Sequence, residues 1–202
     1  MSEYTAIADV GDTLITLLRD NTRDLISADS IVLLSPADVE GQQNIRLTLF
    51  LYSIVENPYL KNQEMQNPNP TELLYPPVAL DLYYLVTAYA STQIVDKTQQ
   101  TMEEHRILGR AIRIFYDHAI LSGSILRGGL SGTDEELRII LNPTSLEDFN
   151  KLWSVFPNQN YRTSVSYLVT PVKIDSTRAM TVQRVVSKET DHSSMEPKRK
   201  EE

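Results

Sequence analysis

The stretch PPVALDLYYLVTAY at residues 76–89 predicts a central β-strand. Both faces of its two-residue period are largely apolar, which is typical of a strand that is covered on both sides. Pro76 and Pro77 mark where the strand begins, because a proline inside the ladder has no N–H to donate. Asp81 interrupts the apolar run, and a carboxylate in such a place must be hydrogen-bonded or paired. We interpret Asp81 as structural rather than catalytic.

A second long apolar stretch at residues 46–56 predicts the neighbouring strand in the same sheet. Shorter strand patterns occur at 31–34, 137–141 and 161–174. Helical spacing predicts helices at 3–27, 101–118 and 145–156, with capping boxes at Thr101–Glu104 and Thr144–Glu147. The inward side chains expected for the second helix are Met102, Ile107, Leu108, Ala111, Ile112 and Phe115. We therefore predict an α+β fold: a single mixed sheet of about four to five strands, covered by three helices.

Two long connections interrupt this pattern. Residues 57–75 are rich in Asn, Gln and Pro and predict an ordered excursion without regular structure. Residues 121–135 hold four of the seven glycines, which permit positive φ and close backbone approach. After the last strand, we predict a C-terminal extension. The expected division is a domain at 1–175, an extended arm at 176–187 and a disordered tail at 188–202.

The composition is that of an ordinary soluble globular protein, with 41% hydrophobic and 23% charged residues among 202. The net charge of −8 argues against non-specific binding of nucleic acid, whose phosphates select basic surfaces. No run approaches the roughly 20 apolar residues of a membrane span. The absence of cysteine excludes disulfides and thiolate chemistry, and fits synthesis in the cytoplasm.

Catalytic signatures are weak. The three histidines, His105, His118 and His192, lack metal-ligand spacing, and the segment at 129–133 lacks the last glycine of a nucleophile elbow. The sequence thus predicts no catalytic residue, no metal and no cofactor. An accessory hydrolase that uses Asp81 and His118 is the competing hypothesis. The long connections and the extension favour a binding or assembly role.

Several sequence blocks in one order resemble a known family, the tail-terminator or cap proteins of phage-tail-like contractile injection systems, of the Photorhabdus virulence-cassette and antifeeding-prophage type. The blocks are LFLYSIVENP from Leu49, PPVALDLYYLVTAY from Pro76, EHRILGRA from Glu104, LRGGL from Leu126, ELRIIL from Glu136, EDFNKLW from Glu147 and YRTSVSY from Tyr161. The resemblance runs from the first helix to about Asp175. Members of the family often carry a longer C-terminal portion than the stretch that follows Asp175 here.

The resemblance implies a structural function rather than an enzymatic one. Copies of the chain form a hexameric ring at the membrane-distal end of the inner tube, stop tube growth and anchor the last sheath layer. The implied partners are the chain itself, the inner tube protein and the sheath protein, with a tape-measure protein or a second cap paralogue as further candidates. The particle assembles in the bacterial cytoplasm and is then released or membrane-anchored. The alternative is a cap adaptor paralogue, or a small non-enzymatic adaptor of another assembly.

Two sets of residues are candidate contact sites. Apolar or charged side chains in the two long connections are expected at the oligomer and tube interface, because connections of this length are usually functional. They are Tyr59, Leu60, Leu126, Arg127 and Leu130. The alternating apolar residues of the arm can add as a strand to the sheath, or pack on the chain's own domain. They are Ile174, Met180, Val182, Val185 and Val186.

Overall fold

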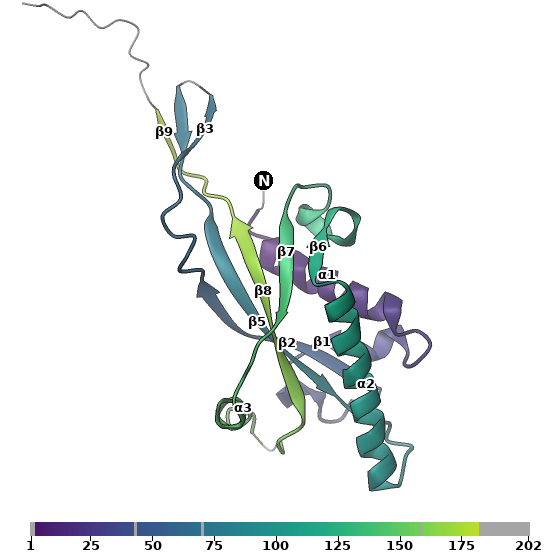
Figure 1. Cartoon of the computed structure of the whole chain (residues 1–202). Coiled ribbons are helices and arrows are strands. Elements are labelled where there is room, and N and C mark those ends of the chain that lie inside the picture. The colour runs from purple at the N-terminus through teal and green to yellow at the C-terminus, as the bar shows by residue number, and fades with distance from the viewer. Residues whose placement is uncertain (1–2, 43, 70, 158, 182–202) are drawn as a thin grey trace, which may run out of the picture.

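The computed structural model describes residues 3–42, 44–69, 71–157 and 159–181, and confirms the α+β class. Over these residues the helices are α1 (Ala6–Asn21), α2 (Lys97–Asp117) and α3 (Leu146–Trp153). In the same part of the chain, a six-stranded mixed sheet, here the main sheet, has the order β1-β2-β5-β8-β7-β6 (Figure 1). Its strands are β1 (Ile31–Leu33), β2 (Leu47–Glu56), β5 (Val78–Ala88), β6 (Ile120–Ser122), β7 (Glu136–Leu141) and β8 (Ser164–Ile174).

The predicted central strand is confirmed as β5, which pairs with β2 on one side and β8 on the other, both antiparallel. Val86 lies between Leu49 of β2 and Val165 of β8 in this register. Neither β2 nor β5 is an edge strand of the main sheet, as the two apolar sequence patterns predict. The proline pair at 76–77 lies just before β5.

One face of the main sheet carries α1 and α2. The apolar sides of both helices contact every second side chain of β5. Tyr84 is one of these side chains and is fully buried. Phe115 of α2 contacts the Tyr167 ring edge-on, with 4.9 Å between centroids. This layer forms the larger of the two hydrophobic clusters in the described part of the chain.

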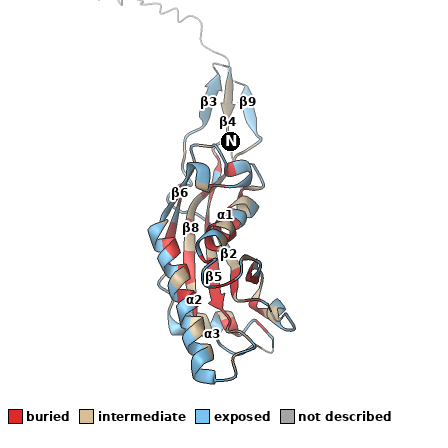
Figure 2. Cartoon of the chain, turned by 90° about the vertical axis from the view of Figure 1, so that its right-hand side faces the viewer, coloured by how far each residue is buried: buried red, intermediate tan, exposed pale blue. Residues whose placement is uncertain are grey.

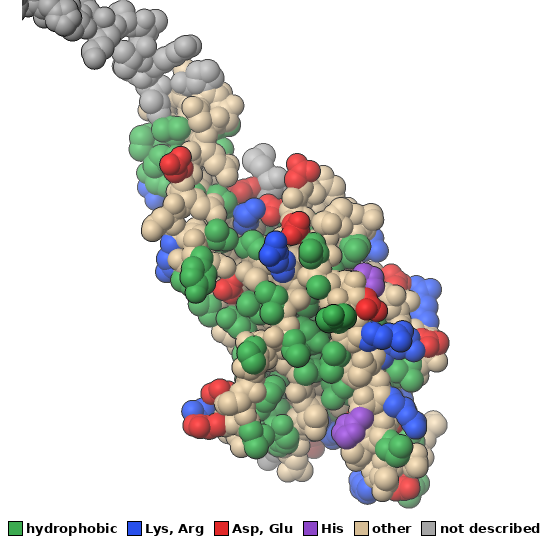
Figure 3. All heavy atoms as spheres, in the orientation of Figure 1, with side chains coloured by type: hydrophobic (Ala, Val, Ile, Leu, Met, Phe, Trp, Pro, Cys, Tyr) green, Lys and Arg blue, Asp and Glu red, His purple; other side chains and the backbone are tan. Residues whose placement is uncertain are grey.

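The other face is covered at one end only. Trp153 and Phe156, in and just after α3, pack on Leu85 of β5, with their rings edge-on at 5.6 Å. Farther along the strands, Tyr83 and Leu168 are half-buried and Ile140 is 45% exposed. The prediction that the sheet is covered on both faces is therefore wrong for this region. Figure 3 shows the hydrophobic side chains gathered there.

The segment at 57–75 is not without regular structure, which corrects the prediction. It forms a hairpin of β3 (Gln66–Asn69) and β4 (Glu72–Leu74). β4 also pairs with β9 (Ala179–Thr181), so the three strands make a second sheet, here the small sheet, that projects from the body (Figure 1). The pattern was misleading because Pro68 lies within β3, an edge strand, where a missing N–H is tolerated.

The helix bounds also differ from the prediction: α1 spans Ala6–Asn21 rather than 3–27, and α3 ends at Trp153 rather than at 156. α2 begins four residues early, capped by Asp96, whose carboxylate accepts from Thr98 N at 2.8 Å. α3 is capped by Ser145, which accepts from Asp148 N at 3.1 Å, rather than by Thr144. Met102 and Ile112 of α2 are exposed, although both were expected to face the core.

Candidate assembly surfaces

The small sheet and its connections form the first exposed surface, here the β-arm (residues 57–75 and 176–181). Tyr59 is 92% exposed and Leu60 half-buried, in the turn that leaves β2. The guanidinium of Arg178 lies 4.1 Å above the Tyr75 ring, and the Tyr75 N–H donates to the Arg178 carbonyl at 3.1 Å. These contacts join the two chain segments at the base of the small sheet.

A buried carboxylate fixes the start of the β-arm. Asp81 accepts hydrogen bonds from Asn57 Nδ2, at 2.9 Å, and from the Thr170 hydroxyl. Asn57 also accepts from the Tyr59 N–H through its side-chain oxygen, at 2.9 Å. The prediction that Asp81 is hydrogen-bonded is confirmed. Burial, and secondly the charge of Asp81, raise the pKa of the neighbouring Tyr83.

The glycine-rich connection is the second surface, here the glycine loop (residues 123–135). It contains two 3₁₀ turns, Gly123–Ile125 and Gly128–Leu130, and the second of them packs on α1. Leu126 and Leu130 are fully buried in the main core, so neither is exposed for the interface contact expected of it. In the folded chain these two leucines hold the loop in place.

Arg127 is the exposed member of the predicted set in this loop. Its backbone N–H donates to the Thr13 hydroxyl at 3.0 Å, and that hydroxyl donates to the Asp9 carbonyl at 2.7 Å. The side chain therefore projects from a backbone anchored to α1. Lys173 of β8 and Glu135 form an ion pair at 3.2 Å, which joins the end of the glycine loop to the strand that leads to the β-arm.

The glycine loop and the β-arm thus lie at the same end of the main sheet, with α3 at the opposite end (Figure 1). The structure brings the exposed residues Tyr59 and Arg127 to this end. Ile174 closes β8 opposite Val78, and Met180 lies in β9, paired with Leu73 of the chain's own β4. Val182, Val185 and Val186 lie outside the described residues.

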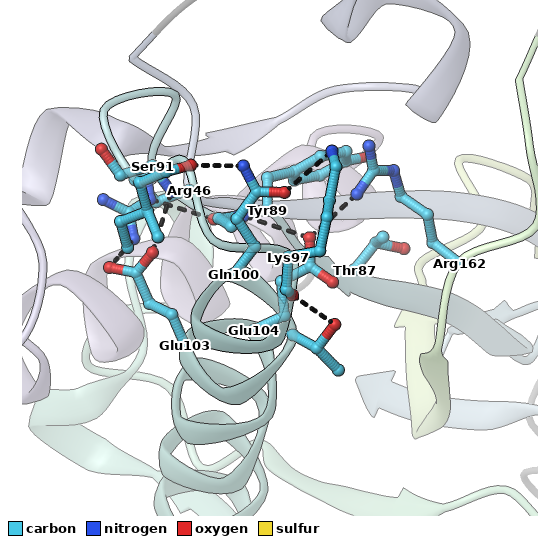
Figure 4. Close-up of polar contacts among 12 residues, drawn as sticks. Arg46, Thr87, Tyr89, Ser91, Lys97, Gln100, Glu103, Glu104 and Arg162 are labelled. Atoms are coloured by element: carbon cyan, nitrogen blue, oxygen red, sulfur yellow. Dashed lines mark hydrogen bonds and ion pairs between the residues drawn. The ribbon is translucent and has the colours of Figure 1, made fainter.

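At the opposite end, a polar hollow of about 800 Å³ opens beside the start of α2. Arg162 and Glu104 line it and pair at 2.9 Å, and Arg46 and Glu103 point toward each other nearby (Figure 4). Burial acts to raise the pKa of Glu103. The hydrogen bonds from the Ser91 N–H and the Arg46 guanidinium together outweigh burial, so the pKa is lowered from its usual value. Sequence reasoning missed this cluster, because its charges come from strands and helices far apart in the chain.

The residues of the competing hydrolase hypothesis are not hydrogen-bonded to each other in the structure. His118 bonds the carbonyl of Ile114 through Nδ1 at 2.9 Å, whereas Asp81 is held by Asn57 and Thr170. Within the described ranges, no group of three or more His, Asp or Glu residues could hold a metal ion. In the same part of the chain, none of the helices is both long and apolar enough to cross a membrane.

The described part of the chain is thus an α+β protein with two exposed surfaces at one end of its main sheet. The chain belongs to the family of the Pvc16 N-terminal domain, whose model matches residues 9–188. This confirms the resemblance to terminator and cap proteins. No curated protein sequence matches the chain.

Two solved structures share the fold. One is the PVC sheath/tube terminator of an extracellular contractile injection system in its extended state, with a TM-score of 0.63 and 18% identity. The other is the tube-terminating cap of the anti-feeding prophage, with a TM-score of 0.64 and 21% identity. The alignments cover 96% and 91% of this chain, and 66% and 60% of the respective structures. The chain therefore spans less than two thirds of the second structure and just under two thirds of the first.

Proposed function

We propose that this chain is a structural cap of the inner tube in a contractile injection system. Copies of it form a hexameric ring at the membrane-distal end of the tube, stop tube growth and anchor the last layer of sheath. The observation that carries this proposal is the family match over residues 9–188. The shared fold of two tube-terminating proteins over more than nine tenths of the chain supports it.

The end of the main sheet that carries the β-arm and the glycine loop is proposed to contact the tube and neighbouring subunits. Tyr59, Leu60 and Arg127 are the residues of the predicted set that this end exposes at least in part. Two anchored segments from separate parts of the sequence converge there. A surface that is fixed before assembly loses less conformational freedom on binding.

The sheath contact is proposed to involve the extension after Ile174. β9 is an edge strand of the small sheet, so its outer side can take another strand by main-chain hydrogen bonding. Truncation after Asp175 should loosen the terminal sheath layer. Sheath attachment that is unchanged in electron micrographs of truncated particles would leave β9 with a purely internal role.

Further partners follow from the same proposal. The ring contacts itself, the tube and the sheath, with a tape-measure protein or a second cap paralogue as additional candidates. The particle is assembled in the bacterial cytoplasm and then released or membrane-anchored. The proposed role is not enzymatic. The alternative is an adaptor, either a paralogue of the cap or a component of another assembly.

The experiment that tests the proposal is purification of particles from cells that express a tagged form of the chain. The chain should co-purify with tube and sheath, and a label on the tag should mark one end of each particle in electron micrographs. Label along the whole particle, or a chain that co-purifies without tube and sheath, would favour the adaptor instead. Particles lacking the chain serve as the control for labelling.

A further inference from the structure

The outward face of α2 is more apolar than the exposed side of a helix needs to be. Met102 is 43% exposed, Ile112 36% and Tyr116 81%. Positions 102, 109 and 116 are seven residues apart, so they lie along one side of the helix. Figure 2 views α2 from this outer side. We call Met102, Gly109, Ile112 and Tyr116 the α2 stripe.

Gly109 lies at the middle of the α2 stripe. A Cβ added there would meet nothing within 4 Å among the described residues, and its φ is not positive. The described fold of the chain therefore gives no reason for glycine at this position, although glycine inside a helix costs about 0.5–1 kcal/mol relative to alanine. A glycine there lets another backbone or a large side chain approach the helix closely.

A different side of the molecule carries a second exposed apolar surface (Figure 3). It is the part of the main sheet beyond α3, here the open face (Tyr83, Ile140 and Leu168), and it is bordered by Tyr52, which packs against the α3 cluster. Ile140 pairs with Leu168 across β7 and β8, and Leu168 pairs with Tyr83 across β8 and β5. The Tyr52 ring lies 6.1 Å from the Tyr83 ring. The row thus crosses neighbouring strands, each roughly 4.8 Å from the next.

We propose that the α2 stripe of one copy packs on the open face of the next copy in the ring. A sheet with an apolar face is stabilised when helices cover it, and α1 and α2 already occupy the other face of the same sheet. Because the two surfaces are different parts of one chain, their pairing is head-to-tail, as a closed ring of more than two copies requires. The inference rests on the proposed cap function and identifies its subunit interface.

Charge favours the same pairing. Arg106 and Arg113 are exposed on the outward side of α2, beside the stripe. Glu147 and Asp148 are exposed in the first turn of α3, which borders the open face. Glu147 also pairs with Lys151 at 2.7 Å, and Asp148 accepts from the Ser145 hydroxyl at 2.6 Å. The whole chain carries a net charge of −8, so a basic helix surface attracts another copy.

Site-specific cross-linking tests the pairing directly, because the chain has no cysteine of its own. The variants are Tyr116→Cys on the α2 stripe, Ile140→Cys on the open face, and the double variant. Rings are assembled from the full chain, with the inner tube protein present, and treated with a short bismaleimide. Val95→Cys combined with Ile140→Cys is the matched control, since Val95 is 90% exposed but precedes α2.

The double variant should give a ladder of covalent multimers, and a mixture of the two single variants should stop at covalent dimers. Each single variant alone, and the Val95 control, should stay monomeric under denaturing conditions. Rings that form normally without this ladder would overturn the pairing and leave the cap function standing. Covalent dimers from Tyr116→Cys alone would also overturn it, because they require a symmetric contact. If no rings form, the cap function and the pairing fall together.

A substitution of the central glycine gives a second readout. Gly109→Leu should block ring assembly in negative-stain images while the melting temperature stays equal or rises, because leucine favours helix more than glycine does. Gly109→Ala, which adds only a methyl group, should reduce assembly less. Normal rings from Gly109→Leu would contradict a close approach at this position.

Discussion

The carboxylate of Asp9 accepts a hydrogen bond from the backbone N–H of Gly129, at 3.1 Å, and so joins α1 to the glycine loop across 120 residues of sequence. The same oxygen accepts from the Thr5 hydroxyl at 2.8 Å. The contact leaves no room for a side chain at Gly128, which also has a φ of +58°. The loop that presents Arg127 is therefore held in place by the hydrogen bond between its own Gly129 and Asp9 of α1.

Gly128→Ala should destabilise the chain more than Gly123→Ala. Both glycines have a φ of +58°, which costs alanine about 1–2 kcal/mol. Only at Gly128 would the added Cβ collide with the Asp9 carboxylate, whereas at Gly123 it would meet nothing within 4 Å among the described residues. Urea unfolding of both variants measures the difference. Equal losses would mean that Asp9 moves aside without cost.

Leu126→Ala should lower the free energy of unfolding by about 2–5 kcal/mol, the range for a fully buried leucine in a packed core. Leu141→Ala is the control, because Leu141 is half-exposed, and it should change stability by no more than about 0.5 kcal/mol. The two variants are compared by urea unfolding. A Leu126→Ala variant as stable as the control would show that the glycine loop is not part of the core.

The sequence predicts the centre of the sheet well, because a strand buried between two others must be apolar along most of its length. Both β2 and β5 satisfy that condition, and their order and pairing are confirmed. The hydrogen bonding of Asp81 was also predicted correctly, since a carboxylate within an apolar strand must be hydrogen-bonded wherever it lies. These predictions depend on local chemistry alone.

The contact surfaces were harder to predict, because burial is decided by segments distant in sequence. Leu126 lies in a glycine-rich loop without periodicity, so its place under α1 leaves no local signal. The small sheet depends on β9, more than a hundred residues after β4. Ile112 faces outward although its spacing fits the inward stripe of α2. The one available signal for that surface was Gly109, a helix-weakening residue inside a long helix.

Asn57→Ala should destabilise the chain by about 1–3 kcal/mol, because it removes a hydrogen bond from the nearly buried Asp81 carboxylate. It also removes the oxygen that accepts from the Tyr59 N–H at the start of the β-arm. Asn160→Ala, an exposed site, is the control. Amide hydrogen exchange should show faster exchange in the β-arm of Asn57→Ala only. Unchanged protection would argue that Thr170 alone holds Asp81.

Alkaline pH should destabilise the chain through buried tyrosines. Burial raises the pKa of Tyr167 to about 12, above its ordinary value of about 10. The neutral ring is therefore the form that the folded state favours, so this stability is fully present below about pH 10 and is lost as the pH rises toward 12. Burial raises the pKa of Tyr84 in the same direction.

Tyr167→Phe keeps the ring against Phe115 but cannot ionise. Between pH 10 and 12 the free energy of unfolding of this variant should therefore fall less than that of the unsubstituted chain. Tyr116→Phe, at an exposed site on α2, should behave like the unsubstituted chain. Both are followed by urea unfolding across the pH series. If the free energy of unfolding fell equally with pH in all three proteins, Tyr167 would be shown to ionise without unfolding.

Tube length measured against the amount of added chain tests the cap function most directly. Purified inner tube protein is polymerised with increasing amounts of the full chain, and tube lengths are measured in negative-stain micrographs. The account predicts that the mean length falls as the ratio of chain to tube protein rises, with the chain at one end of each tube. A length distribution that does not change at any ratio, from a chain shown to be folded, would contradict it.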